Sequence, residues 1–210
     1  MSEQPSTLFM DDSTRASNPG GVTVQKSVWL RYYPKWPLIL GGLLLVSVVL
    51  WLTVHWAFFF AALVMLLVNR LYWRSTTERM TFGCTNPGFV VAADPTLIAV
   101  MTDLSKGLGD YPVVKIIRQD VPDLPKRPVK VGRKVATVAV YKPTADDIPH
   151  WAGFEPRPVE CTTGNLSQIK RSLQSVAAED WEELKQALRH VPKPYTPGTY
   201  PIGWKGEGLH

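Results

Sequence analysis

The sequence lacks the short motifs that mark most common catalytic and cofactor sites. It contains no G-x-S-x-G, H-E-x-x-H, P-loop or G-x-G-x-x-G pattern. Its two cysteines, Cys84 and Cys161, lie far apart and form no C-x-x-C pair, which excludes a disulfide framework. We therefore interpret them as free thiols in a reducing compartment, and we expect no catalytic residue, no metal ligand and no cofactor.

Histidine is also scarce, and no two histidines lie close enough in the sequence to suggest a shared metal. The four are His55, His150, His190 and His210. Metal ligation would require them to converge from distant segments, which the sequence does not suggest. A nucleophilic Cys84 or Cys161 paired with His150 is the weakest hypothesis, because nothing near either cysteine resembles an activating turn.

Charge of one sign is limited in the soluble part of the chain. After Ser75 there are seventeen Lys and Arg against fifteen Asp and Glu, so we expect no nucleic-acid partner. Positive charge is concentrated only in residues 115–134, where seven cations against Asp120 and Asp123 give +5. Those cations are Lys115, Arg118, Lys126, Arg127, Lys130, Arg133 and Lys134. This basic segment either contacts anionic lipid headgroups or is a solvated loop and strand edge, and it lacks interleaved aromatics for base stacking.

The sequence does contain one long apolar run. Residues 36–73 include no Asp, Glu or Lys, and Arg70 lies near the end of the run. One straight helix of this length would measure about 57 Å, whereas the hydrocarbon core of a bilayer is about 30 Å thick. We therefore predict a two-helix transmembrane hairpin within residues 31–75, with spans at about 37–53 and 56–73.

Aromatic and basic residues predict how this hairpin is oriented. Tryptophan prefers the membrane interface, and tryptophans lie at both ends and in the middle of the run. They are Trp36, Trp51, Trp56 and Trp73. Basic residues gather only around its two ends: Lys26, Arg31, Lys35, Arg70, Arg74 and Arg79. The positive-inside rule then places both termini in the cytoplasm, and we expect a multi-pass protein of a bacterial inner membrane.

Two features inside the run have two interpretations each. His55, near the middle, is either a proton-handling group or a solvated residue at the turn, and we favour the turn. The small residues either allow close packing of the two helices or face lipid: Gly41, Gly42 and Ser47 on the first helix, and Ala57 and Ala61 on the second.

Composition divides the rest of the chain. Residues 1–30 contain Ser, Thr, Pro, Gly and acids with few large apolar residues, so we expect a disordered tail. Residues 79–191 form the predicted soluble domain. Residues 192–210 are rich in Pro, Gly and aromatics, and we expect an extended tail against the domain or a partner.

Period-two apolar patterns in the soluble domain predict five short strands, at 89–92, 96–102, 113–117, 134–141 and 158–162. Turns are expected at 86–88, 94–95 and 107–109, and a proline-rich loop at 121–128. Gly132 precedes the longest strand, where a glycine allows a sharp bend. The prediction is an α+β fold with a small β-barrel of OB or SH3 type, or an open antiparallel sheet covered by helices.

Two helices are predicted to follow the strands. Asn165 or Thr163 caps the first, which places Ile169, Leu173 and Val176 on one face. The second begins near Ala178 and places its apolar residues at helical spacing: Trp181, Leu184, Leu188 and Val191. The carboxylates in its first turns suit the positive end of the helix dipole, which explains them better than a metal site does.

One aromatic group is a further surface candidate. His150, Trp151 and Phe154 lie in a loop that contains Gly and Pro. They form either a recognition patch or a cap on the core, and we favour the cap.

Four stretches together resemble an uncharacterised family of small bacterial membrane proteins. They are Gly83 to Gly88, Thr102 to Ser105, Val131 to Ala139, and the pattern His150-Trp151-x-x-Phe154. The resemblance covers about Arg79 to Pro201 and implies a domain of unknown function behind a membrane segment, of bacterial origin. It carries over no catalytic residue. The layout is also similar to barrel-bearing accessory proteins of membrane proteases, by architecture alone.

Three hypotheses about function follow. The first is a non-catalytic accessory or scaffolding protein that presents a cytoplasmic α+β domain to a protein partner at the membrane. The second is a lipid- or ligand-binding module that uses the basic segment. The third is an enzyme that depends on Cys84 or Cys161.

Overall fold

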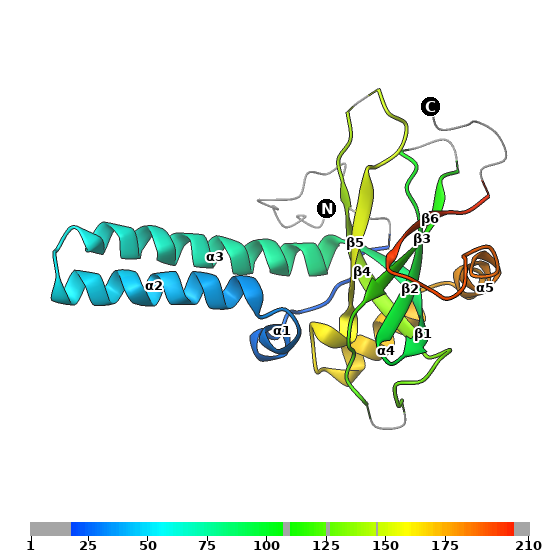
Figure 1. Ribbon diagram of the computed structural model, residues 1–210, viewed down its shortest axis with the longest axis horizontal. Coiled ribbons are helices and arrows are strands. Elements are labelled where there is room, and N and C mark those ends of the chain that lie inside the picture. Colours follow the sequence, from blue (N-terminus) through cyan, green and yellow to red (C-terminus); the bar gives the residue numbers. More distant parts are fainter. Residues whose placement is uncertain (1–17, 107–109, 125–126, 146, 204–210) are drawn as a thin grey trace, which may run out of the picture.

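The structure is a computed structural model that describes residues 18–106, 110–124, 127–145 and 147–203. A hairpin of two long helices projects from one side of an α+β domain (Figure 1). The hairpin consists of α2 (Lys35–Thr53) and α3 (Phe58–Phe82), and the short helix α1 (Lys26–Tyr32) lies at its base. The molecule therefore has an elongated apolar part and a packed domain.

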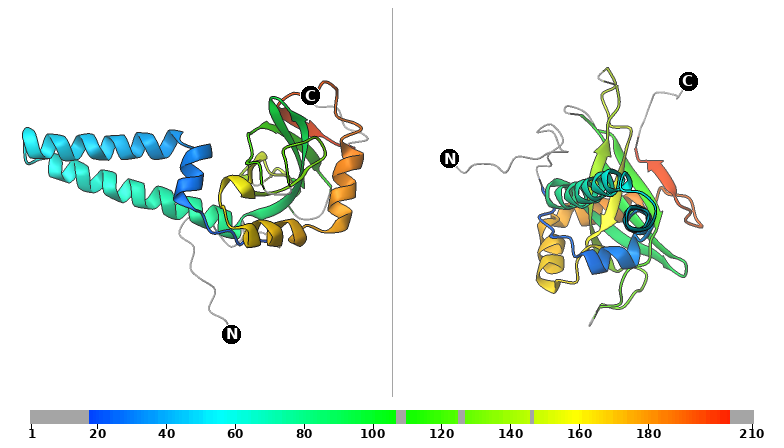
Figure 2. Two further views of the ribbon diagram at one scale, coloured as in Figure 1. Left: turned by 90° about the horizontal axis from the view of Figure 1, so that it is seen from below. Right: turned by 90° about the vertical axis from the view of Figure 1, so that its left-hand side faces the viewer.

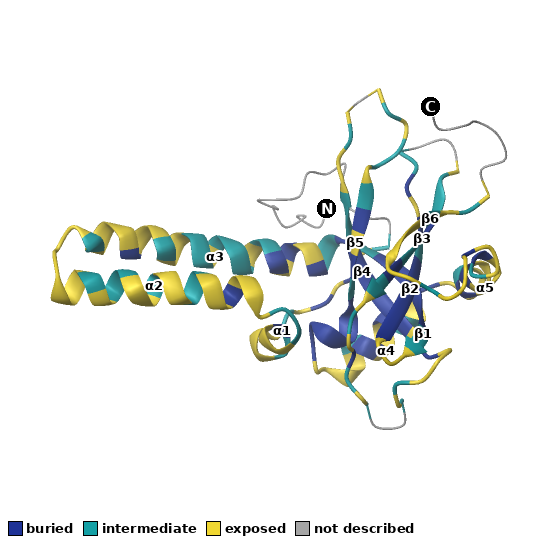
Figure 3. Cartoon of the chain, viewed as in Figure 1, coloured by how far each residue is buried: buried dark blue, intermediate teal, exposed yellow. Residues whose placement is uncertain are grey.

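Both hairpin helices are long and apolar enough to cross a membrane, as predicted from the sequence. Their apolar side chains are largely exposed, in contrast to the buried strands of the domain (Figure 3). The chain reverses at residues 54–57, where His55 is exposed and its Nδ1 accepts a hydrogen bond from the Ala57 amide at 3.1 Å. So much exposed apolar surface is unfavourable in water and favourable in lipid, so the hairpin indicates membrane association.

The two helices pack against each other without using their glycines. A Cβ atom at Gly41 or Gly42 would meet no atom within 4 Å, so both glycines face outward. Close packing through glycine is therefore wrong, and the outward-facing alternative holds. The second helix also continues past the predicted end at Trp73, as far as Phe82, and leads directly into the sheet.

The domain is built on one curled antiparallel sheet of six strands (Figure 2). Along the sheet the strands follow the order β5-β4-β1-β2-β3-β6. Their bounds are β1 Cys84–Ala93, β2 Thr96–Asp103, β3 Pro112–Arg118, β4 Lys134–Lys142, β5 Gly153–Pro158 and β6 Gly198–Pro201. The sheet curls into a half-barrel with β5 and β6 at its edges, which confirms the α+β class in its open-sheet form.

Two local predictions about strands and turns were wrong. The expected turn at 86–88 lies inside β1, which accepts Pro87 because the ladder with β2 begins only at Gly88. The expected strand at 158–162 is displaced to β5, and residues Val159–Cys161 form the 3-10 helix η2 instead. The prolines of β5 interrupt the period-two pattern that would indicate a strand. An edge strand tolerates proline because it needs hydrogen bonds on one side only.

The chain before α1 is ordered from residue 18, so the expected disordered tail to residue 30 is too long. The Gly20 amide donates to the Gly83 carbonyl at 2.9 Å, and the Val22 amide donates to the Met80 carbonyl at 3.2 Å. Only glycine fits at position 20, because a Cβ there would lie 2.7 Å from the Met80 carbonyl oxygen. Residues 1–17 of the expected tail lie outside the described residues.

Helices α4 (Leu166–Ser175) and α5 (Ala178–Ala187) cover the outer face of the sheet. Asn165 caps α4, since its side chain accepts from two amides of the first turn. Alternate strand residues separate two cores: Leu97 and Ala99 pack toward α5, whereas Ile98 and Val100 face the enclosed side. The C-terminal segment adds β6 to β3, and Gly132 makes the predicted bend with a φ of 85°.

Candidate functional site

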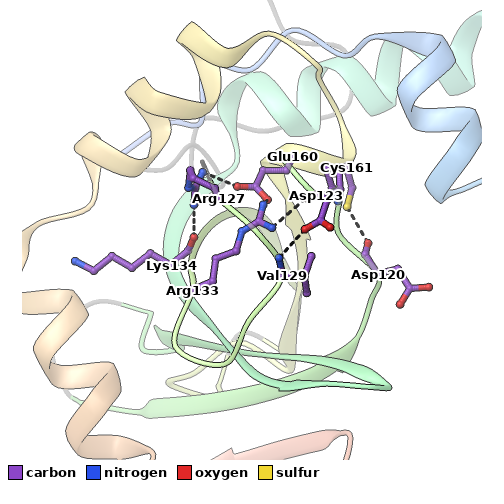
Figure 4. Close-up of polar contacts among 9 residues, drawn as sticks. Asp120, Asp123, Arg127, Val129, Arg133, Lys134, Glu160 and Cys161 are labelled. Atoms are coloured by element: carbon purple, nitrogen blue, oxygen red, sulfur yellow. Dashed lines mark hydrogen bonds and ion pairs between the residues drawn. The ribbon is translucent and has the colours of Figure 1, made fainter. Parts of the chain in front are cut away.

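The basic segment at 115–134 does not form one charged surface. Its arginines Arg127 and Arg133 turn inward to the carboxylate of Glu160 in η2 (Figure 4). Arg127 Nη1 lies 2.7 Å from Glu160 Oε1, and Arg133 Nη2 contacts Glu160 Oε2. The side chains of Arg133 and Glu160 are almost fully buried, so this pair is part of the interior.

Further hydrogen bonds join this charged cluster to the backbone. Arg133 Nη1 donates to the Pro122 carbonyl at 3.0 Å, and Arg127 Nη2 donates to the Lys134 carbonyl at 2.5 Å. Burial raises the pKa of the Glu160 carboxyl, and the two guanidiniums oppose that shift. A buried charge that loses its partner costs several kcal/mol, so the cluster has a structural role in holding the loop before β4.

Two lysines of the segment also have internal partners. Lys115 on β3 donates from Nζ to the Phe154 carbonyl of β5 at 2.5 Å, which links the two arms of the half-barrel. Burial lowers the pKa of the Lys115 ammonium. The Nζ of Lys134 lies 4.6 Å from the centre of the Trp181 ring of α5, and α5 lies on the side of the sheet away from the hairpin.

The remaining cations of the segment are less constrained. Arg118 and Lys130 are exposed, and Lys126 lies outside the described residues. Contact between the basic segment and lipid stays a prediction. Three cations of the segment, Lys115, Arg127 and Arg133, have partners inside the domain.

The three aromatic candidates lie at one end of the inner core. Phe154 is fully buried, and Trp151 stacks on Tyr141 with ring centroids 5.9 Å apart. His150 stacks on Tyr111 with centroids 4.3 Å apart. This is the arrangement of a cap on the core rather than of an exposed patch.

A cavity of about 750 Å³ opens where β1 and β2 separate. The last pair of the β1–β2 ladder at this end is Gly88 with Val100. Beyond it, and among the described residues, residues 84–87 pair with β4 and residues 101–103 pair with β3, while Pro19 bridges to Cys84 and the Thr85 amide donates to the Asn18 carbonyl at 2.9 Å. Side chains from both separated ends and from α5 line this cavity, which we call the slot.

The slot is acidic. Four carboxylates and one histidine line it: Asp103, Asp110, Asp180, Glu183 and His190. The Thr85 side chain also lines it, and Thr85 is only 5% exposed. Its hydroxyl has no hydrogen-bond partner among the residues that the structure describes. The slot therefore presents several carboxylates, whereas the Thr85 hydroxyl is buried behind its lining.

Tyr141 lies between the slot and the next cavity, and it lines both. Its hydroxyl lies 2.7 Å from Thr102 Oγ1, so it connects β4 to β2 across the separated strand β1. Burial raises the pKa of the Tyr141 phenol and of the neighbouring Cys84 thiol. Burial also raises the pKa of Cys161, whose Sγ donates to the Asp120 carbonyl at 3.3 Å. Both thiols are therefore protonated at neutral pH.

A second cavity, of about 500 Å³, lies where the hairpin meets the sheet, and we call it the junction pocket. Its walls come from α1, the start of α2, the last turns of α3, and strands β4 and β5. Trp29 Nε1 donates to the Tyr72 hydroxyl at 2.9 Å, which fixes α1 against α3. Trp36, at the start of α2, is 58% exposed.

Three cations and one carboxylate line the junction pocket. They are Arg79, Lys142, Arg157 and Glu155. Glu155 lies 2.9 Å from Lys142 Nζ and 3.7 Å from Arg157, and the hydrogen bond from Lys142 lowers the pKa of its carboxyl. These ion pairs are half exposed, so each contributes little to stability and opens easily.

Further cations lie on α1, at the start of α2 and along the later half of α3, toward the domain end of the hairpin. We call these and the three pocket cations the collar: Lys26, Arg31, Lys35, Arg70, Arg74, Arg79, Lys142 and Arg157. Among the described residues, the ion pairs of the collar involve Glu78, which pairs with Arg74 at 3.0 Å, and Glu155. The collar therefore has a net charge of about +6 with those two carboxylates included, eight minus two.

Sequence reasoning missed Glu160, Thr85 and the junction pocket. Glu160 is acidic in a stretch interpreted as a strand, and its partners lie 27 and 33 positions away. The Trp29–Tyr72 contact joins residues 43 positions apart. The one available signal was the basic clustering at the ends of the apolar run.

These observations define a class of protein: an α+β half-barrel carried on a hairpin of two apolar helices. Residues 75–191 match the family described as "Protein of unknown function (DUF3239)", and the chain belongs to this family. This match confirms the resemblance to an uncharacterised family.

No curated protein matches the chain. Among solved structures, it is similar to a crystal structure of a "putative membrane protein" from Corynebacterium diphtheriae. The two are 17% identical, with a TM-score of 0.47 over 56% of this chain and 99% of that chain.

Proposed function

We propose that this protein is a non-catalytic accessory protein of the bacterial inner membrane, and that its slot receives a positively charged segment of a partner protein. The observation that carries the proposal is the slot itself, with its four carboxylates. Among the described residues, residues 101–103 of β2 also pair with no strand on the side of β1. An extended peptide can pair with such an edge.

The positive-inside rule supports an orientation for this proposal. The collar cations gather at the domain end of the hairpin, and the turn at residues 54–57 carries no Lys or Arg. Both termini and the domain then lie in the cytoplasm, where the slot is open to cytoplasmic proteins.

The two other functions have less support. An enzyme that depends on Cys84 or Cys161 needs a thiolate, and burial raises both thiol pKa values. A lipid module built on the basic segment would need free arginines, whereas Arg127 and Arg133 are paired with Glu160.

The test is site-specific photo-crosslinking of the full chain in its native membrane. A photo-crosslinking amino acid replaces Asp110 at the rim of the slot, and the control carries it at the exposed Gln174 of α4. We expect one dominant protein adduct from position 110 only, and its loss in the variant Asp180→Asn/Glu183→Gln. Adducts of equal yield at both positions, or a clean monomer in mild detergent with no adduct, would overturn the proposal.

A further inference from the structure

We propose that the junction pocket binds the headgroup of an anionic phospholipid of the same leaflet. The proposal rests on the hairpin lying in the bilayer, but it does not need the partner protein proposed for the slot. It differs from a role for the basic segment because it uses other residues on another side of the domain.

The first support is depth. The interfacial aromatics of α3 are Tyr72 and Trp73, and the pocket residues Thr76 to Met80 follow them in the same helix. At a rise of about 1.5 Å per residue, those residues stand about 5–10 Å beyond Trp73 along the helix axis. The polar layer of a bilayer occupies about 5–8 Å on each side of the hydrocarbon core. The pocket therefore lies at the level of the headgroups.

The second support is charge. Arg79, Lys142 and Arg157 line the pocket with Glu155, so its net charge is +2. No carboxylate pairs with Arg79 among the described residues, whereas Glu155 holds the other two. A phosphate oxygen can replace one exposed ion pair at little cost and gain charge-assisted hydrogen bonds from guanidinium groups.

The third support is the apolar part of the lining. Trp29, Met80, Val138 and Val140 form one wall, and Trp36 stands exposed at the mouth. A glycerol backbone and the start of an acyl chain suit such a wall, while a free inorganic phosphate gains nothing from it. The lining therefore favours a lipid over a soluble anion.

The pocket is also preformed. The Val22 amide bonds to the Met80 carbonyl, and Trp29 bonds to Tyr72, so the stretch before α2 is fixed against α3 at two points. The guanidinium of Arg157 is placed by the Tyr33 ring, 4.5 Å from its centroid. A site that needs little ordering on binding loses little affinity to conformational entropy.

The test uses the full chain in mild detergent, with lipid adducts counted by native mass spectrometry as phosphatidylglycerol or phosphatidylcholine is added. The pocket variant is Arg79→Gln/Lys142→Gln/Arg157→Gln. The control, Arg118→Gln/Lys130→Gln/Arg189→Gln, removes the same charge from exposed positions elsewhere. We expect the pocket variant to lose about tenfold in phosphatidylglycerol affinity, and the control to stay within about twofold, since each collar charge contributes up to about 1 kcal/mol.

Three results would overturn the proposal: equal affinity for the two lipids, equal loss in both variants, or displacement of phosphatidylglycerol by millimolar glycerol phosphate. The last result would indicate a soluble phosphate ligand. If the pocket variant is unstable, Arg79→Lys/Arg157→Lys keeps the charge and must retain the preference for phosphatidylglycerol.

Discussion

The basic segment at 115–134 and the collar at the hairpin base hold seven and eight cations, but their surroundings differ. In the segment, Arg127 and Arg133 face the buried Glu160, and Lys115 reaches a carbonyl inside the half-barrel. In the collar, cations from distant stretches of the chain meet around a pocket at the membrane end of the domain. A cluster of cations in the sequence therefore does not by itself mark a binding surface. Cations that pair with a carboxylate inside the fold are no longer available to bind a ligand.

The collar is expected to lie on the cytoplasmic side of the membrane, and labelling of His55→Cys tests this orientation directly. We expect a membrane-impermeant maleimide to label this variant fully in intact spheroplasts, since His55 is exposed at the turn farthest from the collar. The native chain is the control, because its two thiols lie in the domain with raised pKa values. Labelling of the variant only after permeabilisation would reverse the topology.

The largest change in stability is expected in the basic segment. Glu160→Gln removes the counter-charge of two arginines, one of them almost fully buried, and should lower the free energy of unfolding by about 3–5 kcal/mol. Chemical denaturation of the full chain measures this change in the free energy of unfolding, with a spectroscopic signal from the domain as the readout. The control Glu155→Gln breaks half-exposed pairs and should cost no more than about 1 kcal/mol. Equal effects of the two substitutions would remove the distinction between segment and collar.

A smaller effect is expected at Lys134, the cation of the segment that faces an aromatic ring. Lys134→Met removes the interaction with Trp181, and the cost should be about 0.5–1 kcal/mol in the same denaturation experiment. The substitution should leave lipid binding unchanged, because α5 lies away from the hairpin. A loss of anionic-lipid affinity without a loss of stability would instead assign a membrane contact to the segment.

The elements with strong local signals were predictable from the sequence. The hairpin, strands β2, β3 and β4, and helices α4 and α5 follow from apolar runs, period-two patterns and the Asn165 cap. Elements that depend on distant partners were not. The ordered residues 18–25 need the end of α3, and β6 needs β3, while neither has an apolar pattern of its own.

The candidate site follows the same division. The basic segment was visible as a cluster in sequence, yet its carboxylate Glu160 lies in another element, where no spacing rule could find it. In the sequence, the collar was recognisable only as basic residues near the two ends of the apolar run. Lys142 and Arg157 lie far from that run in sequence, and the curl of the sheet brings them to the same pocket. The split between β1 and β2 that makes the slot depends on strand pairing, which the sequence at Pro87 does not predict.

The most direct test of the account compares the membrane proximity of the two basic regions. A fluorophore is attached to Lys142→Cys in the collar or to Lys130→Cys in the segment, and the full chain is reconstituted into liposomes with a headgroup-linked quencher. We expect strong quenching at position 142 and weak quenching at position 130. Equal quenching at both positions, or stronger quenching at position 130, would show that the collar is not the basic region that lies at the membrane.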